Sequence, residues 1–446
     1  MKRILILTYF FPPANFAGSY RMESFAKYLH EYGYFPVIVT RHWSREISTY
    51  RELSASSGTD VVHKKHPHYE VYSVPYRSSL RDRIHLKYGD RSRILTRKFL
   101  SSLEWLSSFF TSRFVSFGNL QRFAESLIRD DHFSLLIASA SPYILFRFAR
   151  DIHKKTGIPW VADYRDEWTE KPYRKNNSFS AQMKMPFESI LEKRWVGTAS
   201  AVISVSEVLT QRISALVKKK GYVVMNGFDE DLYESIPARI SSNQFTIVYN
   251  GTLYPGQKAE VFLDALKRVI REEKGSLKIK ILFAGTAVNP AQAQRIRECM
   301  KGFESYYEVT ERIPKNEIIS IQKGAELLLL SGYPELKGIF SSKIFEYLAC
   351  GRPVLLCPSD NDVMERLIRQ TSSGYITNTV DEAYELLKKL TQEYFTKGRQ
   401  HHSGNRNEIE QYSFRKQVGV LSAALDEVIA DNETIGPCHV KTKSRS

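Results

Sequence analysis

Two successive series of alternating strands and helices constrain the fold of this 446-residue chain more than any other feature. In each series, short runs of branched apolar residues end in a polar or glycine-containing loop that leads into a helix. The first series opens with residues 3–9 and the second with residues 245–250. Such runs are typical of strands buried on both faces of a parallel sheet, and their alternation with helices is typical of doubly wound α/β domains. We therefore predict two Rossmann-like domains facing each other across a cleft.

A polar break between the two series sets the predicted domain boundaries. Residues 1–236 are expected to form the N-terminal domain and residues 244–405 the C-terminal domain. A helix at about residues 410–430 is expected to rejoin the N-terminal domain. Residues 431–446 are predicted to form a basic, disordered tail.

The chain is basic, with 64 Lys and Arg against 49 Asp and Glu and a formal charge of +15. This excess favours phosphates, nucleic acid or anionic lipid as partners. A basic stretch at 77–113 is interleaved with Trp, Phe and Leu. Its basic residues are Arg77, Arg81, Arg83, Lys87, Arg91, Arg93, Arg97, Lys98 and Arg113. The stretch fits a helix on an anionic membrane, or an ordinary amphipathic helix with its apolar face in the core. We expect no nucleic-acid partner, because no recognised binding module accompanies the stretch.

Redox state and location follow from what the sequence lacks. No convincing signal peptide and no apolar run of about 20 residues is present. The four cysteines form neither a CxxC pair nor a Cys/His metal spacing: Cys299, Cys350, Cys357 and Cys438. We expect reduced thiols, no metal site and a cytoplasmic protein that is peripheral on the inner face of the cell membrane.

Two loops of the first series are candidate functional sites. Gly18 follows the first strand, at the edge where open α/β sheets bind ligands. Without a GxGxxG fingerprint, Gly18 is interpreted either as a residue close to a phosphate or as a simple turn former. Asp166 follows the strand at 159–162 and is predicted to bind the acceptor or to assist as a base. Its alternative is a structural carboxylate paired with Arg165 or with a loop N–H.

The segment from Gly338 to Val354 is the most informative part of the second series. Ser341 or Ser342 is predicted to cap a helix, whose free N–H groups suit a phosphate. Lys343 in the first turn opposes the helix dipole unless an anion lies there. Glu346 shares its helix face and could accept hydrogen bonds from both hydroxyls of a ribose. The alternative is an exposed Lys–Glu pair on a surface helix.

In their order and spacing, the motifs of the chain resemble retaining nucleotide-sugar glycosyltransferases of family 4, which have the GT-B architecture, of the bacterial cell-envelope polysaccharide type. The segments that carry the resemblance lie between Ile4 and about Val428, at residues 11–18, 163–168, 204–206, 226–229, 249–252, 312–314 and 343–353. The resemblance implies a UDP- or GDP-linked sugar bound by the C-terminal domain. It implies a glycan or lipid-linked saccharide acceptor bound by the N-terminal domain, and no cofactor.

The resemblance also assigns roles to single residues. Glu346 matches the glutamate that holds the ribose, and Gly251 and Lys258 match the glycine turn and basic residue that lie against the diphosphate. Arg312 and Ile313 match the loop that receives the base. A sixth residue, Gly18, matches the acceptor-domain loop that approaches the donor phosphates and sugar.

Two departures from the family pattern matter for function. Gly338 stands where a second glutamate would contact the donor sugar, so the backbone N–H groups of residues 338–340 are predicted to take its place. Thr252 stands where many members carry Arg, and Lys343 is predicted to supply the missing charge. These departures leave a second interpretation open, a catalytically degenerate GT-B protein acting as a membrane-associated partner subunit. A sugar-nucleotide epimerase of the same architecture is a further alternative.

The predicted mechanism is metal-independent glycosyl transfer. The charge that develops on the leaving diphosphate is the main electrostatic problem, and Lys258, Lys343 and the helix start at Ser342 are the predicted stabilisers. In retaining members the leaving phosphate can itself accept the acceptor proton, so that Asp166 assists rather than being required.

Overall fold

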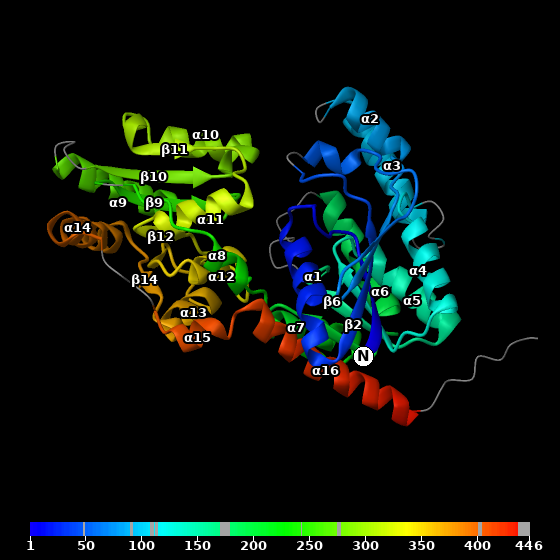
Figure 1. The fold of residues 1–446 in the computed structure, drawn as a ribbon. Coiled ribbons are helices and arrows are strands. Elements are labelled where there is room, and N and C mark those ends of the chain that lie inside the picture. The colour runs from blue at the N-terminus through cyan, green and yellow to red at the C-terminus, as the bar shows by residue number, and fades with distance from the viewer. Residues whose placement is uncertain are drawn as a thin grey trace, which may run out of the picture. The chain divides into compact units, whose positions relative to one another are not determined.

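The computed structural model describes residues 1–47, 50–89, 92–107, 111, 115–169, 179–241, 243–273, 278–399 and 404–435. The chain divides into two compact units, Met1–Met225 with Gln417–Ser446, and Asn226–Lys416. Each unit is built on one sheet of largely parallel strands (Figure 1).

The sheet of the N-terminal unit has the order β3-β4-β2-β1-β5-β6-β7-β8, and its strands are parallel except for β3, which runs antiparallel to β4. The strands are β1 (Lys2–Thr8), β2 (Tyr34–Arg41), β3 (Val62–Lys65), β4 (Glu70–Val74), β5 (Leu135–Ala140), β6 (Trp160–Tyr164), β7 (Ala201–Ser204) and β8 (Gly221–Val223). The helices are α1 (Ala17–Tyr28), α2 (Leu80–Tyr88), α3 (Ile94–Ser107), α4 (Asn119–Asp130), α5 (Ile144–Thr156), α6 (Phe179–Val196), α7 (Glu207–Val217) and, from Gln417 onward, α16 (Phe414–Ile435).

The C-terminal unit has a fully parallel sheet in the order β11-β10-β9-β12-β13-β14. The strands are β9 (Phe245–Asn250), β10 (Ile279–Ala284), β11 (Tyr307–Val309), β12 (Leu327–Leu330), β13 (Val354–Leu356) and β14 (Gly374–Ile376). The helices are α8 (Glu230–Ser235), α9 (Glu260–Glu272), α10 (Pro290–Cys299), α11 (Lys315–Gly324), α12 (Lys343–Ala349), α13 (Val363–Thr371), α14 (Val380–Lys397) and α15 (Arg406–Glu410).

Burial of the central strands explains why the alternation of strands and helices could be recognised in the sequence. Residues Ile4 to Leu7 of β1 and the whole of β5 and β12 are buried. Such strands need helices on both faces of the sheet, which accounts for their unbroken apolar runs. The two predicted strand–loop–helix series are thus confirmed as two doubly wound sheets.

The two units meet in sequence between Met225 and Asn226, before the predicted polar break at 236–244. The residues between Asn226 and this polar break form hydrogen bonds with other parts of the C-terminal unit. The main chain of Phe228 exchanges hydrogen bonds with Tyr412 and Phe414, and Lys323 Nζ donates to the carbonyl oxygens of Tyr233 and Ile236. The polar composition at 236–244 therefore marks a surface segment rather than the change of unit.

From Gln417 onward, α16 packs on the N-terminal unit. Tyr34 Oη donates a hydrogen bond of 2.6 Å to Asp426, and Lys220 pairs with Glu427. Residues 431–435, predicted as tail, complete this helix, because Asn432 is fixed by a hydrogen bond to Ser200. Residues 436–446, with Cys438, lie outside the described residues.

The basic stretch at 77–113 forms two helices, α2 and α3, and Arg91 and Arg113 lie outside the described residues. The start of α2 is fixed by a capping box between Ser79 and Asp82. No residue of α3 is buried, and Leu95 and Phe99 are 82% and 62% exposed. The interpretation of this stretch as a core-packed amphipathic helix is therefore wrong for α3.

Candidate functional site

Two glycine turns meet at the carboxyl edge of the C-terminal sheet. Gly251 ends β9 with φ +92°, and Gly285 ends β10 with φ +78°, conformations that glycine adopts at little cost. Gly251 N–H donates 2.6 Å to Ala284 O, and Thr286 Oγ1 donates 3.0 Å to Gly251 O. A Cβ on Gly285 would lie 3.4 Å from Gly251 Cα. The positive φ angles therefore explain why both positions are glycine, and the two turns lie in van der Waals contact.

Helix α12 is fastened to the end of β9 by side chains one turn apart. Tyr347 Oη accepts 2.8 Å from Asn250 N–H. Lys343 Nζ donates 3.0 Å to both Tyr249 Oη and Thr252 O. A Cβ on Gly251 would lie 2.9 Å from Lys343 Cε. The Lys343 side chain therefore extends over the Gly251 turn instead of pointing into solvent.

The charge of Lys343 is held by neutral oxygens. Burial lowers the pKa of Lys343 from 10.5 to about 8, and the nearby carboxylate of Glu346 opposes that shift. A buried ammonium group without a directly bound carboxylate is stabilised by any anion that reaches it. An anionic ligand at the Gly251 turn would supply that missing charge.

Glu346 pairs with a residue that the sequence analysis missed. Glu346 Oε1 accepts 2.6 Å from Lys315 Nζ, and Glu346 Oε2 accepts 3.4 Å from Asn250 Nδ2. The predicted alternative, an exposed Lys343–Glu346 pair, is wrong, because Lys343 turns toward Tyr249. The position of Lys315, directly after the 312–314 motif and at the start of α11, is the signal that could have revealed it.

The loop that carries Arg312 and Ile313 runs along the end of β10. Gly285 N–H donates 3.2 Å to Glu311 O, and Ala287 N–H donates 3.1 Å to Thr310 O. Both predicted residues of this loop are partly buried. They share the carboxyl edge of the sheet with the Gly251 turn.

Lys258 is exposed in the loop that precedes α9. Its neighbour Gln257 is buried and donates 2.7 Å from Nε2 to Ser331 O. Arg295 Nη2 donates 2.8 Å to Gln257 O while its guanidinium pairs with Glu260. The backbone beside Lys258 is therefore fixed, although its ammonium group stays in solvent.

Ser342 directly precedes α12, but it is not a side-chain cap. Its backbone is already helical, at φ −58° and ψ −22°, and its side chain makes no capping hydrogen bond. A capping side chain requires an extended backbone to reach the N–H groups of the first turn. The predicted side-chain cap is therefore wrong for Ser342, whereas the predicted end is confirmed by Gly351 at φ +61° beyond Cys350.

Gly338 does not present a free N–H to a ligand. Its backbone has φ +78°, and its N–H donates 2.6 Å to Asp362 Oδ2. Asp362 also pairs with Arg366 at 3.0 Å. The prediction that backbone N–H groups of residues 338–340 replace the missing glutamate is therefore wrong for Gly338, and it stays a prediction for residues 339 and 340. A carboxylate from the loop after β13 lies beside Gly338 instead.

In the N-terminal unit, Gly18 is buried and makes room for a guanidinium group. A Cβ built on Gly18 would overlap Arg165 Nη1. Arg165 is held by two carbonyl oxygens, with Nε 2.7 Å from Ala140 O and Nη2 3.0 Å from Ser141 O. Arg165 was predicted only as a partner for Asp166. The contact with Gly18 spans about 150 positions of sequence, so no local motif reveals it.

A buried ion pair lies at the same edge. Arg21 Nη2 and Asp163 Oδ1 are 2.9 Å apart, and Ser139 Oγ donates 2.7 Å to Asp163 Oδ2. Asp166, in contrast, is exposed. Burial lowers the pKa of Arg165, and the carboxylates of Asp163 and Asp166 oppose that shift. Both roles of Asp166, in acceptor binding or base assistance and as a structural carboxylate, stay predictions.

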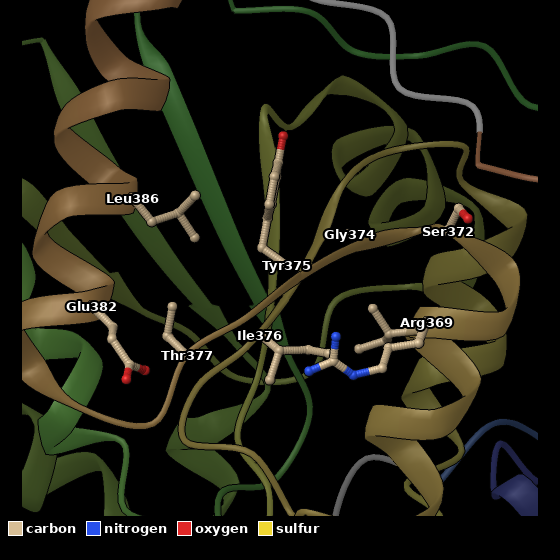
Figure 2. A pocket seen from close by; sticks show the side chains of 9 residues that line it. Arg369, Ser372, Gly374, Tyr375, Ile376, Thr377, Glu382 and Leu386 are labelled. Atoms are coloured by element: carbon tan, nitrogen blue, oxygen red, sulfur yellow. The ribbon is translucent and has the colours of Figure 1, made fainter.

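A hollow of 710 Å³ lies along the edge strand β14, between α13 and α14 (Figure 2). It contains none of the predicted site residues, and β12 and β13 separate it from β9 in the sheet. Its one arginine, Arg369, pairs with Glu365 at 2.9 Å. The hollow therefore lies apart from the Gly251 turn and from the predicted donor-site residues.

The predictions of reduced thiols and of no metal site also bear on the chemistry of the chain. Cys299, Cys350 and Cys357 are free thiols. Among the described residues, no three His, Cys, Asp or Glu side chains gather as metal ligands, and no helix is long and apolar enough to cross a bilayer. Metal independence stays a prediction.

Comparison with known proteins agrees with this layout. A family model described as "Glycosyl transferases group 1" matches residues 244–393. The match includes every predicted residue of the C-terminal edge, whereas Gly18 and Asp166 lie outside it. No curated protein sequence matches the chain.

Solved structures match over almost the whole length. Trehalose-6-phosphate synthase OtsA has a TM-score of 0.61 at 12% identity, covering 95% of this chain and 99% of that one. Sucrose-phosphate synthase from Thermosynechococcus elongatus has a TM-score of 0.60 at 12% identity, covering 97% and 100%. Anabaena Alr3699/HepE in complex with UDP and glucose has a TM-score of 0.58 at 12% identity, covering 96% and 100%. The chain has the GT-B fold. At such low identity the GT-B likeness establishes the architecture, and the chemistry rests on the residues.

Proposed function

We propose that this GT-B protein transfers a sugar, with retention of configuration, from a UDP- or GDP-sugar to a lipid-linked saccharide in cell-surface polysaccharide synthesis. The observation that carries the proposal is the joint placement of Lys343 and Glu346 at the Gly251 turn. A cation held by neutral oxygens and a carboxylate one helical turn away match the needs of a diphosphate and a ribose. The family model matched by residues 244–393 and the UDP complex of Anabaena Alr3699/HepE support this choice.

Each remaining group has a place in this proposal. Lys343 and Lys258 stabilise the leaving diphosphate, and the loop with Arg312 and Ile313 receives the base. Asp362, which lies beside Gly338, contributes the carboxylate on the donor-sugar side. Exposed Asp166 contacts the acceptor.

Isothermal titration with UDP and GDP tests the donor site directly. We expect one of the two nucleotides to bind, and Glu346→Ala to weaken it about 100-fold, because two hydrogen bonds to a charged acceptor are lost. Lys397→Met, on the distant α14, serves as a control for a surface change. Equal affinity of Glu346→Ala and the unchanged protein would contradict the proposed ribose contact.

Catalysis is tested without a known acceptor. A panel of nucleotide sugars is scored for slow hydrolysis, before and after treatment with a chelator. We expect hydrolysis of one donor, and we expect it to survive the chelator, because Lys258 and Lys343 supply the positive charge. Loss of turnover that added Mg²⁺ or Mn²⁺ restores would contradict metal independence.

Helix α3 is the proposed contact with the inner face of the cell membrane. Leu95, Phe99 and Leu106 are exposed beside the basic Arg93 and Lys98. Exposed apolar groups next to cations bind anionic bilayers. We expect sedimentation with anionic but not neutral vesicles, lost in Leu95→Asp/Phe99→Asp and kept in the control Ile240→Asp, which changes another exposed apolar residue.

A second candidate, the catalytically degenerate partner subunit, is favoured by one observation. The Gly338 N–H is already bonded to Asp362, so it cannot contact a donor sugar. That candidate predicts vesicle binding with no binding of UDP or GDP, and the titration above separates the two functions.

A further inference from the structure

A cavity of 260 Å³ lies in the N-terminal unit among side chains of α3, α5, α6 and the loop after β6. None of the residues singled out in the sequence as site residues lines it. Two of its aromatic residues come from the carboxyl edge of the sheet: Tyr143 follows β5 and Trp168 follows β6. Tyr143 Oη donates 2.8 Å to Glu167 O and 3.3 Å to Asp166 O. The cavity wall is thus bonded to the loop that carries Asp166.

The apolar part of the cavity wall is a set of fixed rings. Tyr143 and Trp168 are stacked, with centroids 5.0 Å apart and planes at 4°. Trp168 in turn contacts Trp195, with centroids 5.2 Å apart. Trp105 of α3 closes the cavity on the other side and meets Phe187 of α6 edge to face. These contacts hold flat apolar surfaces in place before any ligand arrives.

Two carboxylates share the cavity with these rings. Glu104 comes from α3, and Glu188, which is 8% exposed, comes from α6. Arg81 Nη1 lies 3.9 Å from Glu104 Oε2, and burial raises the pKa of Glu104. A hydrocarbon chain in the cavity would remove the remaining solvent from the two carboxylates, at a cost in free energy. A sugar ring avoids this cost. Its C–H face packs on an aromatic ring, and its hydroxyl groups donate to carboxylates.

The volume limits how much ligand fits. Small-molecule sites usually measure about 300–1,000 Å³, and 260 Å³ lies just below that range. One monosaccharide ring is therefore accommodated, whereas an extended oligosaccharide is not. Exposed Phe187 and Ile190 lie on the same helix as Glu188, and they are 51% and 59% exposed. Of these two, Phe187 meets Trp105 of the cavity wall edge to face, so one exposed ring lies next to the cavity.

We propose that the cavity formed by Trp105, Tyr143, Trp168, Glu104 and Glu188 binds one neutral sugar ring of the acceptor. This proposal rests on the glycosyltransferase function proposed above and specifies the acceptor side of that same reaction. Ring stacking selects the ring face, and the two carboxylates select the positions of its hydroxyl groups.

Saturation-transfer NMR with titration tests the cavity, using the methyl glycosides of common hexoses and N-acetylhexosamines as probes. At least one glycoside is expected to bind the full-length protein. Trp105→Leu removes a stacking surface and Glu104→Gln removes a charged acceptor at unchanged shape. Each is expected to raise the Kd about tenfold, which corresponds to about 1.4 kcal/mol. The control Phe395→Leu removes an exposed aromatic ring from α14 and is expected to leave the Kd unchanged.

The outcomes separate this proposal from the donor-site proposal. Absence of glycoside binding, or equal binding by both variants and the unchanged protein, overturns the sugar cavity. Binding of octyl but not methyl glycosides also overturns it, since the chain rather than the ring is then recognised. UDP and GDP are titrated on the same preparation. Nucleotide binding without glycoside binding refutes only the cavity, and glycoside binding without nucleotide binding refutes only the donor site. Thermal unfolding confirms that Trp105→Leu is folded, and Glu104→Gln provides the isosteric second test.

Discussion

The carboxyl edges of the two sheets differ in how they place charge. In the C-terminal unit, charged side chains stand at the edge itself: Lys343 over the Gly251 turn and Glu346 beside Lys315. In the N-terminal unit, the Arg21–Asp163 pair is buried, and residues that follow β5 and β6 line an aromatic cavity. One edge therefore places a cation and a carboxylate together, and the other places aromatic rings beside carboxylates. This difference is what the two proposals above assign to a charged donor and a neutral acceptor.

The largest expected effect comes from the buried pair of the N-terminal edge. Arg21→Met leaves Asp163 buried without its cation, a loss of about 3–5 kcal/mol of unfolding free energy. At about 2–4 °C per kcal/mol for a unit of this size, the melting temperature should fall by roughly 6–20 °C in scanning calorimetry.

The matched control is Arg268→Met, which removes an exposed ion pair with Asp381. Exposed pairs contribute about 0–1 kcal/mol, so that variant should melt within a few degrees of the unchanged protein. Equal shifts for both variants would mean that the Arg21–Asp163 pair does not stabilise the N-terminal unit.

The same contrast explains what could be predicted from sequence. The C-terminal edge was largely predictable, because Gly251, Lys258 and Glu346 sit in short motifs with fixed spacing. The partners of those residues could not be predicted from the sequence. Lys315 reaches Glu346 from 31 positions away, and the orientation of Lys343 toward Tyr249 depends on how α12 packs against β9.

The N-terminal edge was predicted less well for a physical reason. Gly18 was selected for its turn, but its neighbour in space, Arg165, comes from the loop after β6. Pairing of β1 with β5 and of β5 with β6 brings these segments together, and that adjacency is a property of strand order. The aromatic cavity was missed for the same reason, because its lining comes from segments far apart in sequence, with three residues from α3, three from α6 and one from α5.

The next effect probes the cation of the C-terminal edge. Lys343→Met keeps the buried stem and removes the charge, so UDP or GDP should bind about 10- to 100-fold more weakly, as expected for charge-assisted hydrogen bonds. The corresponding nucleoside, which lacks phosphates, should bind unchanged in isothermal titration. A parallel loss for nucleotide and nucleoside would place the defect in the shape of the site and not in its charge.

The pH dependence of nucleotide binding gives a smaller and more specific effect. Burial sets the pKa of Lys343 at about 8 in the free protein, and a bound diphosphate stabilises the ammonium form and raises that pKa. Binding above pH 8 therefore takes up a proton, and affinity should fall by up to about tenfold per pH unit between about pH 8 and about pH 9.5. Below the pKa of 8 the group is already charged, so this contribution is fully present at about pH 7.

Titrations of UDP or GDP across that pH range measure how steeply the nucleotide affinity falls with pH. Lys343→Met should give a flat profile, because it has no group to titrate there. If the affinity of Lys343→Met still falls with pH, the proton that is taken up on binding belongs to another residue.

The smallest effect concerns the contact between Gly18 and Arg165. Gly18→Ala places a methyl group where Arg165 Nη1 lies, so the guanidinium must move away from the edge. Because an arginine side chain is flexible, the stability cost should stay within about 1 kcal/mol. Donor hydrolysis should slow about fivefold while nucleotide affinity stays unchanged, if the N-terminal edge contributes to the reaction and not to donor binding. A double-mutant cycle decides the route: in an Arg165→Met background, Gly18→Ala should have no further effect, since its target is gone. Additive losses would show that Gly18 and Arg165 act independently, with Gly18 acting through its own backbone.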